Sequence, residues 1–95
     1  MLFYNLTIIA DSTVDQQALT FIKQKQADCP FKIDVLELLD SPHEGTTFSL
    51  QHKAADNQNL MVFKSKFSQP LQQELSSMLP AGQTVFFEST MKYIV

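Results

Sequence analysis

The chain has 95 residues, of which 44% are hydrophobic, and a formal net charge of −3 at pH 7. This length sustains one core, so we expect a single domain over residues 1–95, and the apolar content argues against intrinsic disorder. All seven basic residues are scattered lysines, which disfavours nucleic acid as a partner because bidentate recognition of phosphates and guanine edges relies on arginine.

Cys29 is the single cysteine, so the sequence predicts neither an intramolecular disulfide nor a cysteine-based zinc site. Residues 1–7 lack the basic lead-in of a signal peptide. No apolar run approaches the ~18 residues of a membrane span. We therefore expect a cytoplasmic protein without a membrane partner.

The first predicted element is a strand over residues 2–10. One of its two stripes is wholly apolar apart from a tyrosine hydroxyl, and we expect it to face the core (Leu2, Tyr4, Leu6, Ile8 and Ala10). A helix is predicted next, with Ser12 as its capping residue and Asp15 near the positive end of its dipole. It should end near Asp28, because Pro30 disfavours helical backbone at Cys29.

A second strand is predicted over about residues 31–39, and its pattern leaves the core-facing side open. Either Ile33, Val35 and Leu39 face inward together with Glu37, or Leu36 and Leu38 do so together with Asp34. The loop 40–45 then returns the chain as an antiparallel neighbour over residues 46–53. There Thr46, Phe48, Leu50 and His52 alternate with a wholly polar stripe, which is typical of a strand with one buried face.

Asp56 is the predicted cap of a long helical segment that continues to residue 78. Its apolar stripe consists of Leu60, Phe63, Phe67, Leu71, Leu75 and Met78. Pro70 predicts either a kink or a break near residues 68–69. A last strand is predicted over residues 84–95, with Val85, Phe87 and Met91 beneath the helices.

This element order, β-α-β-β-α-β, predicts an α+β fold, the ferredoxin-like sandwich, with a four-stranded antiparallel sheet and helices on one face. The uncovered face should then have a polar middle between apolar ends. Exposed apolar area commonly marks an interface, so we expect two copies to meet through this face as a homodimer. The predicted dimer contacts are Phe3, Ile9, Phe86 and Ile94.

The polar middle of that face is the candidate ligand-binding site, formed by Asn5, Thr7, Ser49, Gln51, Glu88 and Thr90. Glu88 is its one ionisable member. Buried in a dimer, Glu88 would have a raised pKa and could act as a base or orient a ligand. In the alternative interpretation, these side chains only hydrogen-bond to one another and to water.

The remaining candidates for chemistry have simpler explanations. His52 is expected to be a hydrogen-bonded residue near a strand end, and His43 with Glu44 to belong to a solvated loop. Cys29 is expected to be a small buried residue rather than a reactive thiol. Gly45 and Gly82 are isolated, so no phosphate-binding loop is predicted. We expect no metal and no cofactor.

Three segments resemble one family: Tyr4-Asn5-Leu6-Thr7, Gly45-Thr46-Thr47-Phe48-Ser49-Leu50-Gln51 and Val85-Phe86-Phe87-Glu88-Ser89-Thr90. The family consists of short, uncharacterised bacterial proteins, a domain of unknown function placed in the dimeric α/β-barrel superfamily. The resemblance implies a homodimer whose two sheets form a barrel. The expected function is ligand or partner binding through the sheet face; the alternative is a cofactor-free monooxygenase or isomerase acting on a small molecule.

Overall fold

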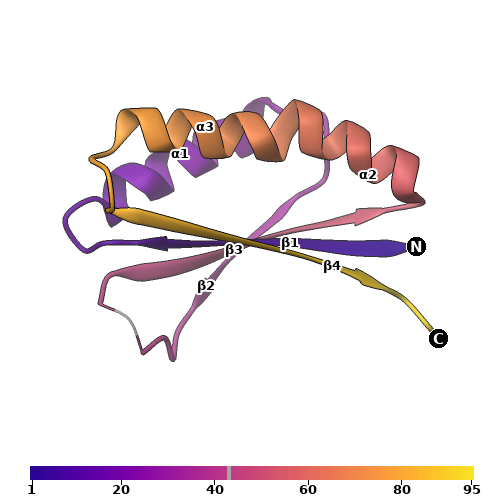
Figure 1. Ribbon diagram of the computed structural model, residues 1–95, viewed down its shortest axis with the longest axis horizontal. Coiled ribbons are helices and arrows are strands. Elements are labelled where there is room, and N and C mark those ends of the chain that lie inside the picture. Colours follow the sequence, from indigo (N-terminus) through magenta and orange to yellow (C-terminus); the bar gives the residue numbers. More distant parts are fainter. Residues whose placement is uncertain (43) are drawn as a thin grey trace.

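The structure is a computed structural model that describes residues 1–42 and 44–95, so the prediction for His43 lies outside the described residues. Four strands form one sheet, and the helical segments lie above it (Figure 1). The elements are, in order, β1 (Leu2–Ala10), α1 (Asp15–Asp28), β2 (Asp34–Leu38), β3 (Thr46–Ala54), α2 (Asn57–Phe63), η1 (Lys64–Ser68), α3 (Gln69–Met78) and β4 (Thr84–Lys92).

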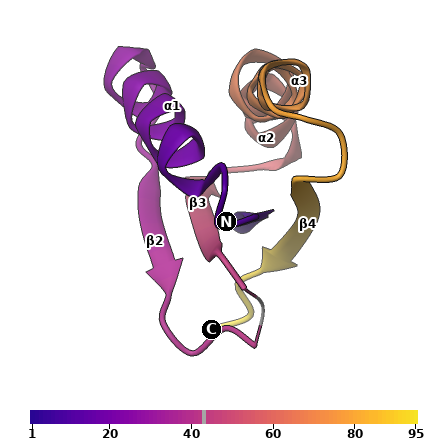
Figure 2. The same ribbon diagram turned by 90° about the vertical axis from the view of Figure 1, so that its left-hand side faces the viewer.

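The sheet has the strand order β2-β3-β1-β4, and every neighbouring pair is antiparallel. Seen along the strands, α1 lies over the β2 side of the sheet and α2–α3 over the β4 side, both on the same face (Figure 2). No helix of the described residues lies on the opposite face. This arrangement confirms the predicted ferredoxin-like sandwich with helices on one face.

The core lies between the sheet and the helices and is built from the stripes that the alternation predicted. Leu6 and Ile8 of β1 are 0% exposed, as is Leu75 of α3. Fully removing side chains of this size from water contributes about 1.5–3 kcal/mol each, so these few residues supply much of the stability. The other large members of the core are Tyr4, Ile22, Phe48, Leu50, Leu60, Phe63, Phe67 and Leu71.

β2 is shorter than predicted, because its first part uses its carbonyls elsewhere. The carbonyl of Lys32 lies 2.9 Å from Nδ1 of His52, and that of Ile33 accepts a hydrogen bond of 2.7 Å from Nε2 of Gln26. Ile33 is buried and Val35 half-buried, so their stripe faces the helices. Leu36 and Leu38 lie on the other face, which resolves the ambiguity of the sequence pattern.

The predicted start of the first helix is wrong by a few residues. Val14 occupies the N-cap position of α1 and no side chain caps it. Instead of Ser12, the carboxylate of Asp11 accepts hydrogen bonds from the backbone N–H and the hydroxyl of Thr13. This local Asx turn ends β1 and turns the chain into α1.

α2, η1 and α3 follow one another without a gap and form one long helix over residues 57–78, the second helix. Pro70 widens this helix rather than breaking it. Residues 64–68 form a π-helical turn, in which the N–H of Gln69 bonds to the carbonyl of Lys64, five residues earlier. Proline has no N–H, and its ring clashes with a carbonyl four residues before it, so the wider turn accommodates Pro70 without ending the helix. The turn also directs Ser68, which is 0% exposed, toward the sheet.

The predicted faces of β4 are wrong and must be exchanged. Opposite residues of neighbouring strands share a face, and Leu6 is paired with Glu88 and Ile8 with Phe86. The stripe of Phe86, Glu88 and Thr90 therefore faces the helices. Val85, Phe87 and Met91 lie on the open face, although their stripe is the more apolar. β4 is an edge strand with a neighbouring strand on one side only. Its register with β1, and not the polarity of its stripes, decides which face it buries.

Candidate functional site

The open face has a polar centre made by two neighbouring rows of side chains. In one row, Asn5 lies between Gln51 of β3 and Ser89 of β4, and Gln51 is paired in turn with Asp34 of β2. In the next row, Thr7 lies opposite Ser49. Because β1 and β3 are the central strands, this polar patch occupies the middle of the sheet.

A chain of hydrogen bonds holds the four central side chains in fixed orientations. Nε2 of Gln51 donates to the hydroxyl of Ser49 at 3.1 Å, and that hydroxyl donates to Oδ1 of Asn5 at 2.5 Å. Nδ2 of Asn5 then donates to the hydroxyl of Thr7 at 2.9 Å. All four residues are half-buried. The patch therefore presents uncharged donors and acceptors that are already oriented.

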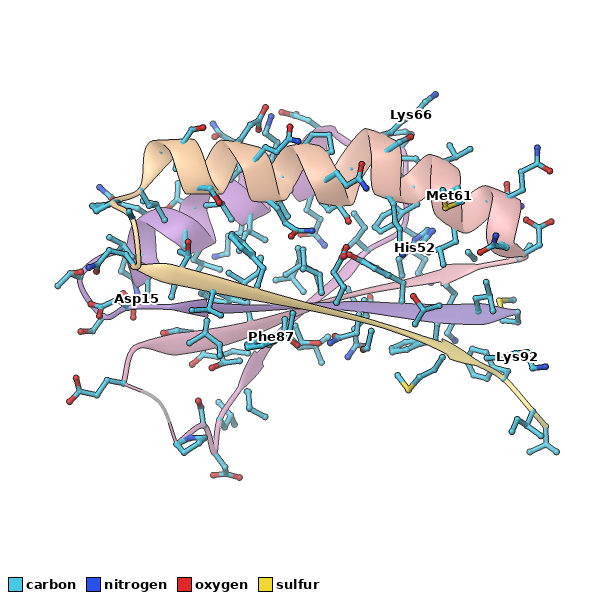
Figure 3. All side chains as sticks on the ribbon, viewed as in Figure 1. Asp15, His52, Met61, Lys66, Phe87 and Lys92 are labelled. Carbon is cyan, nitrogen blue, oxygen red and sulfur yellow. The ribbon has the colours of Figure 1, made fainter. Side chains whose placement is uncertain are left out.

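Apolar side chains flank this polar centre on both edge strands. Leu36 and Leu38 of β2 are 47% and 53% exposed. Val85, Phe87 and Met91 of β4 are 45%, 57% and 52% exposed, and Figure 3 shows Phe87 on the side of the sheet that carries no helix. Large apolar groups exposed on two flanks are typical of an interaction surface.

The structure brings together four of the six predicted ligand-binding residues and separates the other two. Asn5, Thr7, Ser49 and Gln51 form the polar centre, whereas Glu88 and Thr90 lie on the helix face. Of the predicted dimer contacts, Phe3 and Ile9 lie on the open face and are half-buried.

Of the other two predicted dimer contacts, Phe86 packs on the helix side. Ile94 lies beyond the end of β4, where it lines a shallow pocket together with Phe3 and Met91.

Sequence reasoning missed several residues of the open face. The sequence pattern predicts that Ser89 and the apolar stripe of β4 lie under the helices, because that stripe is the more apolar of the two. Asp34, Leu36 and Leu38 belonged to one of the two alternatives left open for the second strand. The pairing of Leu36 with Ser49 assigns the β2 residues to the open face, and the pairing of Phe87 with Thr7 does the same for the β4 stripe. Both registers are set by the whole sheet.

Glu88 instead belongs to a polar cluster between β4, β1 and the second helix. Its Oε1 accepts a hydrogen bond of 2.5 Å from the hydroxyl of Tyr4, and bonds of 3.3 Å from Ser68 and from Nε2 of Gln72. The Tyr4 oxygen also lies 2.8 Å from that of Ser68. Tyr4 and Ser68 are buried and Glu88 is exposed, so the cluster reaches from the core to the surface.

This geometry lowers the pKa of Glu88 in the single chain, whereas the predicted rise applies to a Glu88 buried in a dimer. The hydrogen bond from Tyr4 is the main cause, and Gln72 and the charge of Lys64 act in the same sense against partial desolvation. Burial raises the pKa of Tyr4, and the neighbouring Glu88 adds to that rise. At neutral pH the cluster holds a carboxylate and a protonated phenol.

An aromatic cluster adjoins the polar cluster around Glu88, at the end of the sheet near α2. The ring of His52 stacks on Phe63 with centroids 3.9 Å apart and an angle of 10°. Figure 3 shows His52 between the sheet and the helix layer. Its Nδ1 has the hydrogen bond to Lys32 described above, as expected for a strand residue with a satisfied ring nitrogen. Cys29 is half-buried, with Sγ 3.4 Å from the carbonyl of Phe31.

Residues 1–42 and 44–95 contain no grouping of three histidine, cysteine, aspartate or glutamate side chains suited to a metal ion. Over the same part of the chain, no helix is both long and apolar enough to cross a membrane.

Strand order, helix placement and the uncovered sheet define the class of proteins with a ferredoxin-like sandwich fold. A solved structure, described as "Putative antibiotic biosynthesis monooxygenase from Nitrosomonas europaea", superposes with a TM-score of 0.68 over 100% of both chains at 12% identity. At this identity the likeness shows the fold alone. No curated protein sequence gives a significant match. Residues 1–94 match the family model "Domain of unknown function (DUF4286)", and the chain belongs to this family.

Proposed function

We propose that this protein is a homodimer formed through its open sheet face, which binds a small ligand or a partner at the enclosed polar centre. One observation carries the proposal: a hydrogen-bonded polar patch in the middle of the sheet lies between two exposed apolar edge strands. A second copy over this face removes the apolar flanks from water. It also places two copies of the polar centre against one another.

The exposed edge residues supply the driving force for this contact. Leu36 and Leu38 on one edge and Val85, Phe87 and Met91 on the other are each close to half exposed. Burial of apolar area contributes about 25 cal/mol per Å², so covering five such side chains in each copy favours association substantially. The polar centre costs little to cover, because its four side chains already bond to one another.

The chemistry of the centre favours an uncharged ligand. Asn5 and Gln51 offer amides, and Thr7 and Ser49 offer hydroxyls. The acidic Asp34 borders the patch at its β2 end, and Lys53 lies in the adjoining row. A neutral molecule with an apolar body and one or two hydrogen-bonding groups matches this arrangement.

The alternative is a cofactor-free monooxygenase- or isomerase-like enzyme working in the same enclosed space. The likeness to a fold described as that of a putative antibiotic biosynthesis monooxygenase favours it. The position of Glu88 weighs against it, because this carboxylate, the predicted base, lies on the helix side and bonds to Tyr4. Fold likeness alone is a weak argument for activity, so we prefer the binding function.

Sedimentation equilibrium of matched variants tests the dimer contact. Leu36→Asp places a charge in the apolar flank of β2 and should halve the mass at micromolar concentration. Met61→Asp is the control, because Met61 is 58% exposed on the outward side of α2, far from the open face (Figure 3). An unchanged mass in Leu36→Asp, with circular dichroism showing a folded protein, would overturn the proposal.

Ligand binding is tested separately in the wild-type protein. Thermal unfolding in a library of neutral small molecules should show stabilisation that is lost in Asn5→Ala but kept in Gln72→Ala, a polar control on the helix side. Stabilisation that survives Asn5→Ala would place the ligand elsewhere.

A further inference from the structure

The two edges of the sheet differ in how well they are protected. β2 has five residues, two of them acidic (Asp34 and Glu37), and it lies between Pro30 and Pro42. Short length, charges and nearby prolines are the usual protection of a strand edge. β4 has nine residues without proline and pairs with β1 in an uninterrupted register. Its outer edge is therefore open to another strand.

The backbone groups along this outer edge can be identified from two hydrogen bonds. The N–H of Asp11 bonds to the carbonyl of Gln83 at 2.9 Å, and the N–H of Tyr93 bonds to the carbonyl of Met1 at 3.2 Å. Bonded and non-bonded pairs alternate in an antiparallel ladder, so the odd-numbered residues of β4 bond to β1. The even-numbered residues Glu88, Thr90 and Lys92 direct their N–H and C=O groups outward.

In residues 85–95, positions at equal distances before and after Thr90 mostly carry similar or oppositely charged side chains. Counting outward in both directions, Glu88 corresponds to Lys92, Phe87 to Tyr93 and Phe86 to Ile94. Val85 corresponds in the same way to Val95, and Ser89 to Met91. Ile94 and Val95 are 88% and 114% exposed, so their own chain gives them almost no cover. Beyond β4 the chain runs on, away from the helices (Figure 1).

We propose that β4 pairs antiparallel with β4 of a second copy, with Thr90 on the two-fold axis. Each Glu88 then lies opposite Lys92 of the partner subunit, and each Phe87 opposite Tyr93 of the partner subunit. Opposite charges and aromatic pairs facing one another across strands are stabilising. The hydrogen bonds from Tyr4, Ser68 and Gln72 all go to Oε1 of Glu88, which leaves Oε2 for the lysine.

Neighbouring registers are less favourable. Pairing centred on Glu88 would place like charges directly opposite each other, which is destabilising. Pairing centred on Ser89 would place Phe86 opposite a lysine. The contact uses the edge of the sheet rather than its open face, so it is independent of the dimer proposed above and joins the two four-stranded sheets into one.

Cysteine cross-linking tests the register. Thr90→Cys and Thr84→Cys are made in a Cys29→Ala background and oxidised mildly. Both positions are threonines of β4 whose backbone N–H and C=O groups point away from β1. Across the axis, the Cα atoms of residue 90 should be about 5.5 Å apart, within the range of a disulfide. Those of residue 84 should be roughly 40 Å apart. Covalent dimer should form severalfold more in Thr90→Cys, and equal yields or none would overturn the proposal.

Thr90→Pro provides a second measurement. It removes an outward N–H that the pairing with β1 does not use, so the strand itself should persist. In the Leu36→Asp background, where the face contact is blocked, the edge contact should leave a dimer that Thr90→Pro converts to a monomer. A monomer in Leu36→Asp alone would overturn the edge contact and leave the face contact standing. An association that is unaffected by Leu36→Asp but lost in Thr90→Pro would overturn the face contact and leave the edge contact standing.

Discussion

The two faces of the sheet are made by alternate residues of the same strands, yet they have opposite characters. Leu6 and Ile8 are completely buried under the helices, whereas their neighbours Thr7 and Ile9 are only half-buried. Hydrogen-bonded polar side chains occur on both faces. On the helix side Glu88 ties β4 to the second helix, and on the open side Asn5, Thr7, Ser49 and Gln51 bond to one another. The comparison shows that the helices, and not the polarity of a stripe, decide which face becomes core.

The largest expected effect comes from adjacent residues on opposite faces. Leu6→Ala should lower the free energy of unfolding by about 3 kcal/mol, because it removes buried methyl groups and leaves a cavity. Thr7→Ala should lower it by only about 0.5 kcal/mol, since Thr7 accepts one hydrogen bond on a half-exposed face. Urea unfolding of both variants measures the difference. Similar losses would mean that the open face is packed as tightly as the core.

An intermediate effect is expected from Tyr4→Phe, which removes the main hydrogen bond to Glu88. The variant should lose about 1–2 kcal/mol at neutral pH, because Ser68 and Glu88 lose a partner while Glu88 keeps access to water.

The same variant should also change the pH dependence of stability. The pKa of Glu88 is lowered in the folded protein, so its contribution is present above the ordinary glutamate pKa and is lost as the pH falls through the lowered value. The difference in unfolding free energy between wild type and Tyr4→Phe should therefore shrink on acidification. Urea unfolding at a series of acidic pH values measures it, and a constant difference would contradict the role of Tyr4. Gln72→Ala is the control and should reduce the acid dependence less, because its contribution to the pKa is smaller.

The smallest effect is expected from Ser49→Ala in the polar centre. It removes a donor to Asn5 and an acceptor for Gln51, but both amides can turn to water in a monomer, so the loss should be about 0.5 kcal/mol or less. At concentrations where the proposed dimer forms, the loss should grow, because the amides are then left unpaired away from water. Chemical unfolding at low and high protein concentration separates the two cases.

The element order, the antiparallel sheet and the buried stripes of β1, β3 and the helices could be predicted from the sequence, because central elements carry an unambiguous period. Four of the six predicted ligand-binding residues could be placed in the same way, since Asn5, Thr7, Ser49 and Gln51 lie on central strands. The edge strands could not be assigned so simply. In β4 the more apolar stripe faces outward, and in β2 both stripes contained leucine or isoleucine.

What the chain determined by itself is local: where strands and helices run, where Asp56 caps a helix and which stripes of the central strands are apolar. Only the tertiary structure decided the face of β4, the partners of Glu88 and the π-helical turn at Pro70. The reason is physical. An edge strand takes its face from the register with its neighbour, and a side chain such as Glu88 finds its partners on helices that the chain brings together only after folding.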